Sequence, residues 1–189
     1  MSRIISYAEA ICEASAQEME RDERVVIIGQ GVDDYKGFVG TTSGLAEKFG
    51  PDRVMDTPVA EDGMTGVAIG MALAGLRPIH THIRMDFMLL AVNQLLNIAA
   101  KSRYMSGGAV QVPLTVRTVI GRSWGQGAQH SQGLRQRGAA RIAGDAWPAA
   151  VYGAHATVSA GRVCVWRGTE PAAVDGIWFD LAGVVALLG

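Results

Sequence analysis

The sequence predicts an α/β fold in which a mostly parallel sheet is covered by helices on both faces. Short β-branched runs alternate with helical patterns along residues 1–132, and parallel strands need such crossover helices between them. The runs are apolar along their length, which is typical of strands that are buried on both faces. With 189 residues, the chain is long enough for one α/β domain, or for one domain and part of another.

The first elements have clear local signals. Ser6 and Glu9 form the S-x-x-E pattern of a capping box, and apolar residues follow at helical spacing, so a helix is expected at residues 7–21. The run RVVIIG at residues 24–29 predicts a buried strand that ends in a loop. A short helix at residues 42–49 and a strand at residues 54–56 are expected next.

The alternation continues to about residue 120. The segment GMTGVAIGMALA predicts a helix of small residues at 63–74 that can pack closely against a sheet. A strand is expected at residues 77–83, a long apolar helix at 87–102, and a fourth strand at 113–120. This order completes the pattern of a parallel sheet.

The chain changes character after Gln132. Residues 133–189 contain no lysine, methionine or asparagine, and they are rich in alanine, glycine and valine. Periodicity is weak there, and no element is expected with a definite boundary. An ordinary small-residue segment and an out-of-frame translation of a GC-rich gene both explain this composition. We therefore divide the chain into a domain at residues 1–132 and an atypical tail at residues 133–189, with the sheet truncated or divergent beyond the boundary.

Composition narrows the range of partners and compartments. The formal net charge is −1 and no basic stripe or acidic tail is present, so neither nucleic acid nor a membrane surface is an expected partner. Cys12 and Cys164 are isolated, which argues against a disulfide framework or a zinc site and favours a reducing, cytoplasmic compartment. The acidic residues near the amino terminus do not fit a targeting peptide, and no apolar run approaches the length of a membrane span.

Three short patterns match functional signatures, but a structural role explains each of them better. GQGVDDYKG, beginning at Gly29, is similar to a dinucleotide fingerprint, yet Asp34 occupies the third glycine position. GRSWG matches the nucleophile elbow of serine hydrolases, with Ser123 as nucleophile, yet a glycine-rich stretch follows instead of a helix. His80 and His82 share one face of a strand, but no third metal ligand stands at a recognisable spacing.

Glu61 and Asp62 lie between the strand at 54–56 and the helix at 63–74. At the start of a helix, acidic residues complement the helix dipole by about 0.3–1 kcal/mol. The carboxyl end of a parallel strand is also where α/β sheets bind ligands, and a carboxylate in a cleft there can accept or share a proton. Spacing alone leaves both roles open for Glu61.

Several motifs in one order resemble a known family. RVMDTPVAEDGMTGVAIGMALAGLRPI, AAKSRYMSGG, VPLTVR and GAQHSQ resemble the beta subunit of the thiamine-diphosphate-dependent decarboxylase component of 2-oxoacid dehydrogenase complexes, as in pyruvate, branched-chain and acetoin dehydrogenases. The resemblance covers about residues 4–132 and implies a transketolase-like pyrimidine-binding, thiamine-diphosphate-binding fold. The family's carboxyl-terminal domain is not recognisable here, and VRTVIG replaces FRGPNG near Arg117.

The resemblance implies roles for three residues. Glu61 matches a catalytic glutamate that hydrogen-bonds a ring nitrogen of the cofactor's aminopyrimidine and favours its imino tautomer, which can deprotonate the thiazolium. Phe87, in RMDF, matches an aromatic residue that packs on the pyrimidine, and His130, in AQHSQ, matches a catalytic histidine at the mouth of the site. The structural alternatives are a core phenylalanine and an exposed loop histidine.

The implied function is that of an enzyme subunit. It is the oxidative decarboxylation of a 2-oxoacid with acyl transfer to a lipoyl group, as in pyruvate dehydrogenase. An alpha subunit would supply the ligands of the Mg²⁺ ion and of the diphosphate, so no metal ligand is expected in this chain. Without that subunit the chain is expected to be inactive. Further partners that the resemblance implies are a lipoyl-bearing acyltransferase and a second copy in an α2β2 assembly. The apolar helices at 63–74 and 87–102 also indicate a subunit interface. The alternatives are a non-catalytic truncated paralogue or scaffold and, less favoured, a serine hydrolase that uses Ser123.

Overall fold

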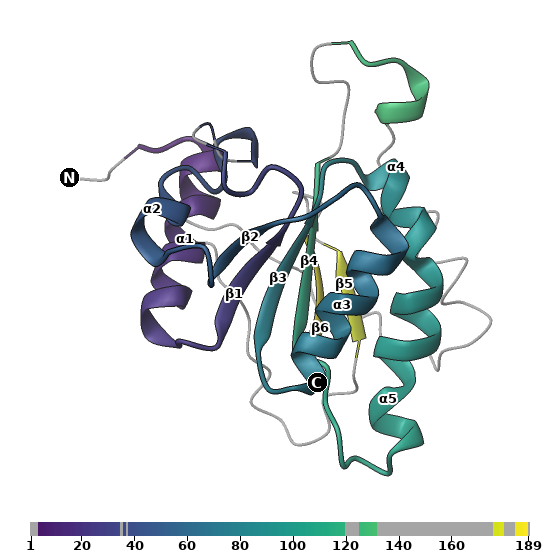
Figure 1. Ribbon diagram of the computed structural model, residues 1–189. Coiled ribbons are helices and arrows are strands. Elements are labelled where there is room, and N and C mark those ends of the chain that lie inside the picture. Colours follow the sequence, from purple (N-terminus) through teal and green to yellow (C-terminus); the bar gives the residue numbers. More distant parts are fainter. Residues whose placement is uncertain are drawn as a thin grey trace.

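The computed structural model describes residues 4–34, 36, 38–119, 125–131, 176–179 and 184–188. In these residues the strands form one sheet in the order β2-β1-β3-β4-β6-β5 (Figure 1). The first four pair in parallel: β1 (Val25–Gly29), β2 (Val54–Asp56), β3 (Arg77–His82) and β4 (Leu114–Thr118). Two antiparallel strands, β5 (Gly176–Phe179) and β6 (Val184–Leu188), extend the sheet beyond β4. The prediction of a mostly parallel sheet is confirmed.

Helices cover both faces of the sheet, as predicted. On one face lie α1 (Tyr7–Arg21) and α2 (Leu45–Phe49), and on the other lie α3 (Glu61–Leu73), α4 (Met85–Met88) and α5 (Ala100–Met105) (Figure 1). The helix expected at residues 87–102 begins two residues earlier and is not uniform. It contains a 3₁₀ turn, η2 (Leu89–Ala91), and a π-helical stretch, η3 (Gln94–Ala99), before α5.

Two helix starts differ from the prediction for local reasons. Gly44 adopts a left-handed conformation with φ of 74°, which an α-helix cannot contain, so α2 begins at Leu45 instead of residue 42. In contrast, α3 begins at Glu61, two residues earlier than expected, with Ala60 as its N-cap. Both acidic residues therefore lie in the first turn of α3.

Each face of the sheet has its own apolar core. Ile28 of β1 belongs to the cluster under α3, α4 and η3, whereas Val25 and Ile27 belong to the cluster under α1 and α2. All five residues of β1 are buried, because β1 lies between β2 and β3 and both of its faces are covered. This burial explains why the strand is apolar without alternation.

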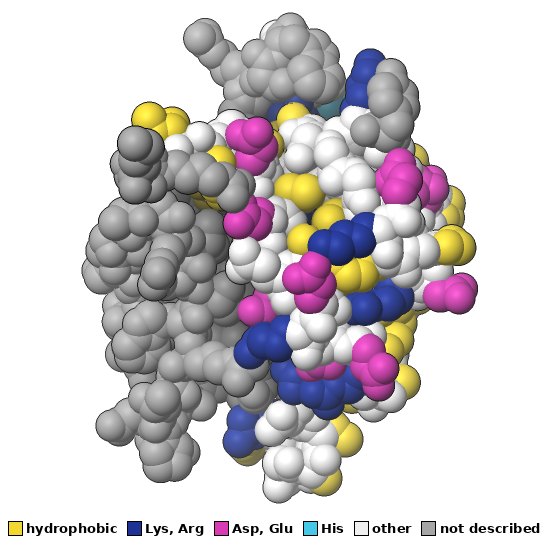
Figure 2. Space-filling view, turned by 90° about the vertical axis from the view of Figure 1, so that its left-hand side faces the viewer, with side chains coloured by type: hydrophobic (Ala, Val, Ile, Leu, Met, Phe, Trp, Pro, Cys, Tyr) yellow, Lys and Arg dark blue, Asp and Glu magenta, His cyan; other side chains and the backbone are white. Residues whose placement is uncertain are grey.

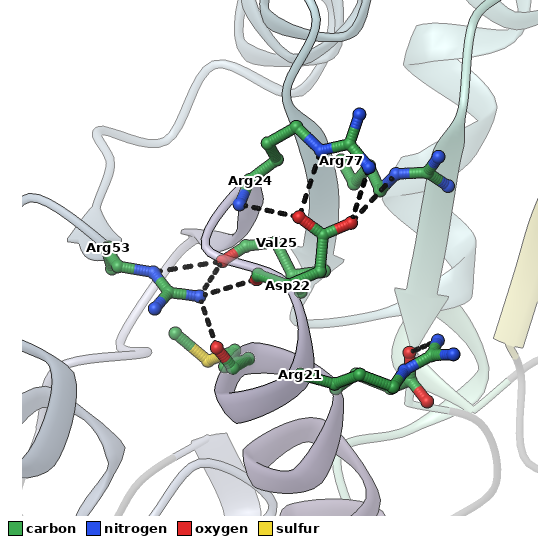
Figure 3. A network of polar contacts seen from close by, with 8 residues as sticks. Arg21, Asp22, Arg24, Val25, Arg53 and Arg77 are labelled. Carbon is green, nitrogen blue, oxygen red and sulfur yellow. Dashed lines mark hydrogen bonds and ion pairs between the residues drawn. The ribbon is translucent and has the colours of Figure 1, made fainter.

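The turn between α1 and β1 is fixed by Arg53, which precedes β2. Its guanidinium Nη2 donates to three main-chain carbonyl oxygens, those of Met19 at 2.8 Å, Asp22 at 3.1 Å and Val25 at 2.7 Å (Figure 3). A delocalised cation with several donors suits a cluster of carbonyl oxygens at a helix end. The contact holds the edge strand to the first helix.

The surface over α1 and α2 carries charges of both signs. Figure 2 shows basic and acidic side chains interspersed on this side of the molecule, and ion pairs join Arg21 to Glu18 and Lys48 to Glu20. Within the described residues, no helix combines the length and the apolar character needed to cross a membrane.

Candidate functional site at the carboxyl edge of the sheet

The predicted site residues follow the carboxyl ends of three parallel strands. Glu61 opens α3 after β2, Phe87 lies in α4 after β3, and His130 ends the 3₁₀ turn η4 (Ala128–His130) after β4. In Figure 1, η4 stands above the upper end of the sheet, close to α4. The carboxyl edge of a parallel sheet is the usual place for a ligand in α/β folds, so the topology brings all three residues to a suitable edge.

Phe87 and His130 contact each other. Their ring centroids are 5.0 Å apart and the rings meet edge to face at 76°, a favourable arrangement for two aromatic rings. Phe87 is partly exposed, whereas Met85 and Met88 beside it are buried. Phe87 is therefore not simply a core residue at the start of a helix.

His130 is partly buried, and its Nδ1 atom makes no hydrogen bond within the part of the chain that the structure describes. This nitrogen has almost no solvent exposure and no partner among the described residues. An unsatisfied buried polar atom costs about 1–3 kcal/mol, so this nitrogen is a candidate for a hydrogen bond to a ligand at this edge. The alternative of a merely exposed loop histidine does not fit this burial.

The Glu61 carboxylate points toward the end of β1. Its Oε1 lies 3.4 Å from Nε2 of Gln30, the residue directly after β1, and Gln30 is only 9% exposed. Glu61 is partly exposed, whereas Asp62 is exposed. The two neighbouring acids therefore differ in environment, and Glu61 is the one directed to the carboxyl edge.

His80 and His82 lie on one face of β3, as predicted. Their rings are 4.4 Å apart, and both Nε2 atoms lie 3.2 Å from the hydroxyl of Thr65 in α3. Burial lowers the pKa of both histidines, that of His82 to about 3. Both rings are buried and hydrogen-bonded, which agrees with packed strand residues, and among the described residues no group of three or more metal-binding side chains occurs.

Gly29 is a structural glycine. A Cβ atom there would lie 1.9 Å from Oγ1 and 2.4 Å from the carbonyl oxygen of Thr81 on β3, so the two strands can approach only without a side chain. Gly31 has φ of 66° and donates its N–H to Oδ1 of Asp56 at 2.6 Å. These contacts agree with a strand-to-loop turn rather than with a dinucleotide fingerprint. Ser123, the residue of the hydrolase alternative, lies outside the described residues.

Two further residues at this edge were not predicted from the sequence. Gln30 holds Glu61, and Arg84, which is 2% exposed, donates to the side chain of Gln126 in the segment that leads to His130. Arg84 thereby joins the start of α4 to the loop of η4. The signal for both residues was their position directly after a strand, which alone does not distinguish them from other loop residues.

A polar cleft lies at the opposite, amino edge of the sheet. It has a volume of about 470 Å³ and is lined by Arg21, Asp22, Glu23, Arg24 and Arg77. Asp22 pairs with Arg24 at 2.8 Å and with Arg77 at 3.2 Å (Figure 3). Hydrogen bonds from Arg24, followed by the charge of Arg77, hold the pKa of Asp22 well below its usual range. The arginines of this cleft already have a carboxylate partner, so the carboxyl edge remains the better candidate site.

Comparison with known proteins agrees with this fold and this edge. Residues 3–178 match the family model described as transketolase, pyrimidine binding domain. The chain is 45% identical over 128 residues to the pyruvate dehydrogenase E1 component subunit beta of Rickettsia conorii, which covers 68% of this chain and 39% of the relative. The mitochondrial subunits of Bos taurus and Homo sapiens are 44% and 43% identical, with 68% of this chain and 36% of each relative covered.

The chain thus spans about two-fifths of the length of these relatives. A solved structure described as "Split gene transketolase, inactive beta4 tetramer" superposes with a TM-score of 0.50 at 19% identity. The superposition covers 65% of this chain and 36% of that chain. At this identity the likeness shows a shared fold.

Proposed function

Because this chain belongs to the transketolase pyrimidine-binding domain family, among the beta subunits of pyruvate dehydrogenase E1 components, we propose that it contributes the aminopyrimidine half of a thiamine diphosphate site. The observation that carries the proposal is Glu61, whose carboxylate lies at the carboxyl edge of the sheet beside Gln30. The reaction would be the oxidative decarboxylation of a 2-oxoacid with acyl transfer to a lipoyl group.

The residues at this edge fit the proposed cofactor. An aminopyrimidine offers ring nitrogens to a carboxylate and a flat face to an aromatic side chain. Glu61 and the partly exposed Phe87 supply these two groups, and His130 has an unsatisfied buried nitrogen beside Phe87. When bound, thiamine diphosphate supplies the centre that stabilises the carbanion left by decarboxylation.

Glu61 has the main chemical role in this proposal. Its carboxylate would hold a proton at one ring nitrogen of the pyrimidine and so set the protonation of the opposite amino group. Phe87 would fix the plane of the ring, and its edge-to-face contact would hold the imidazole of His130 in place. His130, whose imidazole has a donor and an acceptor nitrogen when neutral, would donate or accept a hydrogen bond at the mouth of the site.

The remaining half of the site would come from another subunit. In the part of the chain that the structure describes, no cluster of metal-binding side chains is found, and we propose that an alpha subunit provides the Mg²⁺ and diphosphate ligands. The chain would then be inactive alone. A lipoyl-bearing acyltransferase would accept the acyl group, and an acetyl-transferring specificity is the proposal that the names of the relatives favour.

The outer side of α3 supports contact with another subunit. A Cβ atom at Gly63 or Gly70 would meet no atom within 4 Å, so packing inside the chain does not require these glycines. Val67 and Leu73 on the same side of the helix are each 47% exposed. Apolar residues with glycines between them allow close approach of a second helix, and we propose self-association or alpha-subunit contact through this side.

The cellular location of the protein and the division of its chain into a domain and a tail are also proposals. We propose a cytoplasmic location on the basis of the isolated cysteines, although the bovine and human relatives are mitochondrial by name. We retain residues 1–132 as the cofactor-binding domain and residues 133–189 as an atypical tail. Strands β5 and β6 lie in this tail and join the sheet at its β4 edge.

Reconstitution with a matching alpha subunit tests the proposal. The pair is expected to decarboxylate a 2-oxoacid with an artificial electron acceptor, and only when thiamine diphosphate and Mg²⁺ are present. The chain without the alpha subunit should show no turnover. A pair that assembles but never turns over would support the non-catalytic scaffold instead. The names of the relatives give no support to the hydrolase alternative.

A further inference from the structure

A buried polar group lies inside the apolar core between α3 and the sheet. Thr65, His80 and His82 are 0%, 2% and 1% exposed, and the cluster around them contains Ile28, Ala68 and Ile69. Burying such polar side chains is costly unless they are hydrogen-bonded to one another or to the main chain. Here hydrogen bonds link strand β3 to the start of α3 through His82 and Thr65, and His80 is bonded to the main chain of β1.

The position of the proton on His80 follows from the acceptor that its ring faces. The Nδ1 atom of His80 lies 3.1 Å from the carbonyl oxygen of Ile28, which can only accept, so Nδ1 carries the proton. Burial lowers the pKa of His80, the ring is neutral, and its Nε2 is an acceptor. This nitrogen faces the Thr65 hydroxyl at 3.2 Å.

The Thr65 hydroxyl lies close to three groups. Its Oγ1 atom lies 2.7 Å from the carbonyl oxygen of Glu61, to which it donates, and 3.2 Å from Nε2 of both His80 and His82. His82 is also neutral, because burial lowers its pKa to about 3, and it can donate from Nε2 to this oxygen. The single hydroxyl proton goes to Glu61, so this oxygen accepts from His82, whereas the proton-free Nε2 of His80 only contacts it. The hydroxyl therefore ties Glu61 to His82 of β3.

The start of α3 has no side-chain cap of its own that could hold its first turn in place. Ala60 is the N-cap and makes no side-chain capping bond, whereas α1 has a complete capping box between Ser6 and Glu9. A helix end without a cap frays more readily. The position of the first turn of α3 thus depends on tertiary contacts.

We propose that Thr65 and His82 form a positioning bridge that fixes the main chain of Glu61 against the sheet, while Gln30 holds its carboxylate. The first support leads to β3 through His82, and the second leads to the carboxyl end of β1 through Gln30. The inference rests on the proposed function of Glu61, and it adds residues that act on Glu61 without touching the cofactor. The bridge residues are positioning residues rather than catalytic ones.

Thr65→Val tests the bridge because it keeps the shape of the side chain and removes the hydroxyl. Amide hydrogen exchange in the full chain is expected to become about tenfold faster at residues 64–66, where Met64 N–H donates to the Ala60 carbonyl at 2.8 Å. Exchange at residues 70–73 should change little. Thr65→Ser, which restores the hydroxyl, should return the first-turn rates to those of the wild type.

Thr81→Val is the matched control. The Thr81 hydroxyl is also buried, but it makes no hydrogen bond among the described residues. This variant should leave exchange in the first turn of α3 unchanged. Equal acceleration along the whole of α3 in Thr65→Val, or the same local effect in Thr81→Val, would overturn the bridge.

Activity in the complex with an alpha subunit gives the second readout. Thr65→Val should lower kcat about tenfold or more through misplacement of Glu61 and leave the KM for the 2-oxoacid unchanged, and Thr65→Ser should recover kcat. Unchanged kcat in a variant with faster local exchange would overturn the positioning role. If the wild-type complex has no cofactor-dependent activity, the proposed function fails, and the exchange experiment alone decides whether the bridge holds Glu61.

Discussion

At the scale of single residues, the carboxyl edge shows how identical residue types acquire different environments. Glu61 and Asp62 are adjacent acids in the first turn of α3, so both complement the helix dipole. Only Glu61 is directed to Gln30, and only its main-chain carbonyl accepts from Thr65. The dipole role and the proposed cofactor role are therefore compatible in one residue.

The buried His82 predicts a pH dependence of stability. Its pKa is about 3 in the folded chain against a usual value of 6.5, so between pH 7 and pH 5 the unfolded chain binds a proton that the folded chain does not. The free energy of unfolding should therefore fall by about 2 kcal/mol through His82 alone as the pH decreases over this range. Stability from this residue is fully present above pH 6.5.

Urea unfolding at pH 7 and pH 5 measures this effect when the wild type is compared with His82→Phe. The variant is expected to lose about 2 kcal/mol less stability between the two pH values than the wild type. The carboxylates titrate equally in both proteins and cancel in the comparison. An identical pH dependence in the two proteins would show that His82 is protonated in the folded state.

At the scale of elements, prediction succeeded where local chemistry determines the element. The capping box of α1 and the β-branched run of β1 are complete within a few residues, and both elements lie where the sequence placed them. The start of α3 depends on the contacts of Thr65 with β3, which no local pattern reveals. The apolar periodicity of this segment suits an α-helix, so it likewise could not predict the π-helical stretch η3.

Two glycines in different elements should respond oppositely to alanine. Gly29→Ala places a Cβ atom 1.9 Å from Thr81 Oγ1, and forcing β1 away from β3 is expected to cost about 3 kcal/mol or more. Gly63→Ala meets no atom within 4 Å and should stabilise α3 by about 0.5–1 kcal/mol. Thermal unfolding of the two variants and the wild type measures both effects. Destabilisation by Gly63→Ala comparable to that of Gly29→Ala would contradict the packing described here.

At the scale of the whole molecule, the residues of the candidate site follow the ends of separate strands. Its residue types were predicted through family motifs, because Glu61, Phe87 and His130 are far apart in the sequence and each has an ordinary structural alternative. The Phe87–His130 contact agrees with those assignments. Gln30 and Arg84 were not predicted, because their roles depend on which loops meet at the sheet edge.

The exposed side of α3 predicts an effect on assembly. Leu73→Glu places a charge on the surface that contains Val67 and Gly70, and a charge buried in an interface is unfavourable, so the variant should form smaller assemblies than the wild type. Ile4→Glu is a matched control, because Ile4 is 95% exposed and precedes α1. Light scattering after size exclusion measures the masses. Equal masses for wild type and Leu73→Glu would place the interface elsewhere.

The decarboxylation rate of Glu61→Gln, in the reconstituted complex with an alpha subunit and thiamine diphosphate, tests the central claim most directly. Glutamine keeps the size of the side chain but cannot share a proton with the pyrimidine, so the rate should fall by about a hundredfold or more. Asp62→Asn removes the neighbouring charge from the same helix turn and should retain the wild-type rate. Wild-type turnover by Glu61→Gln, or an equal loss in Asp62→Asn, would contradict the assignment of Glu61.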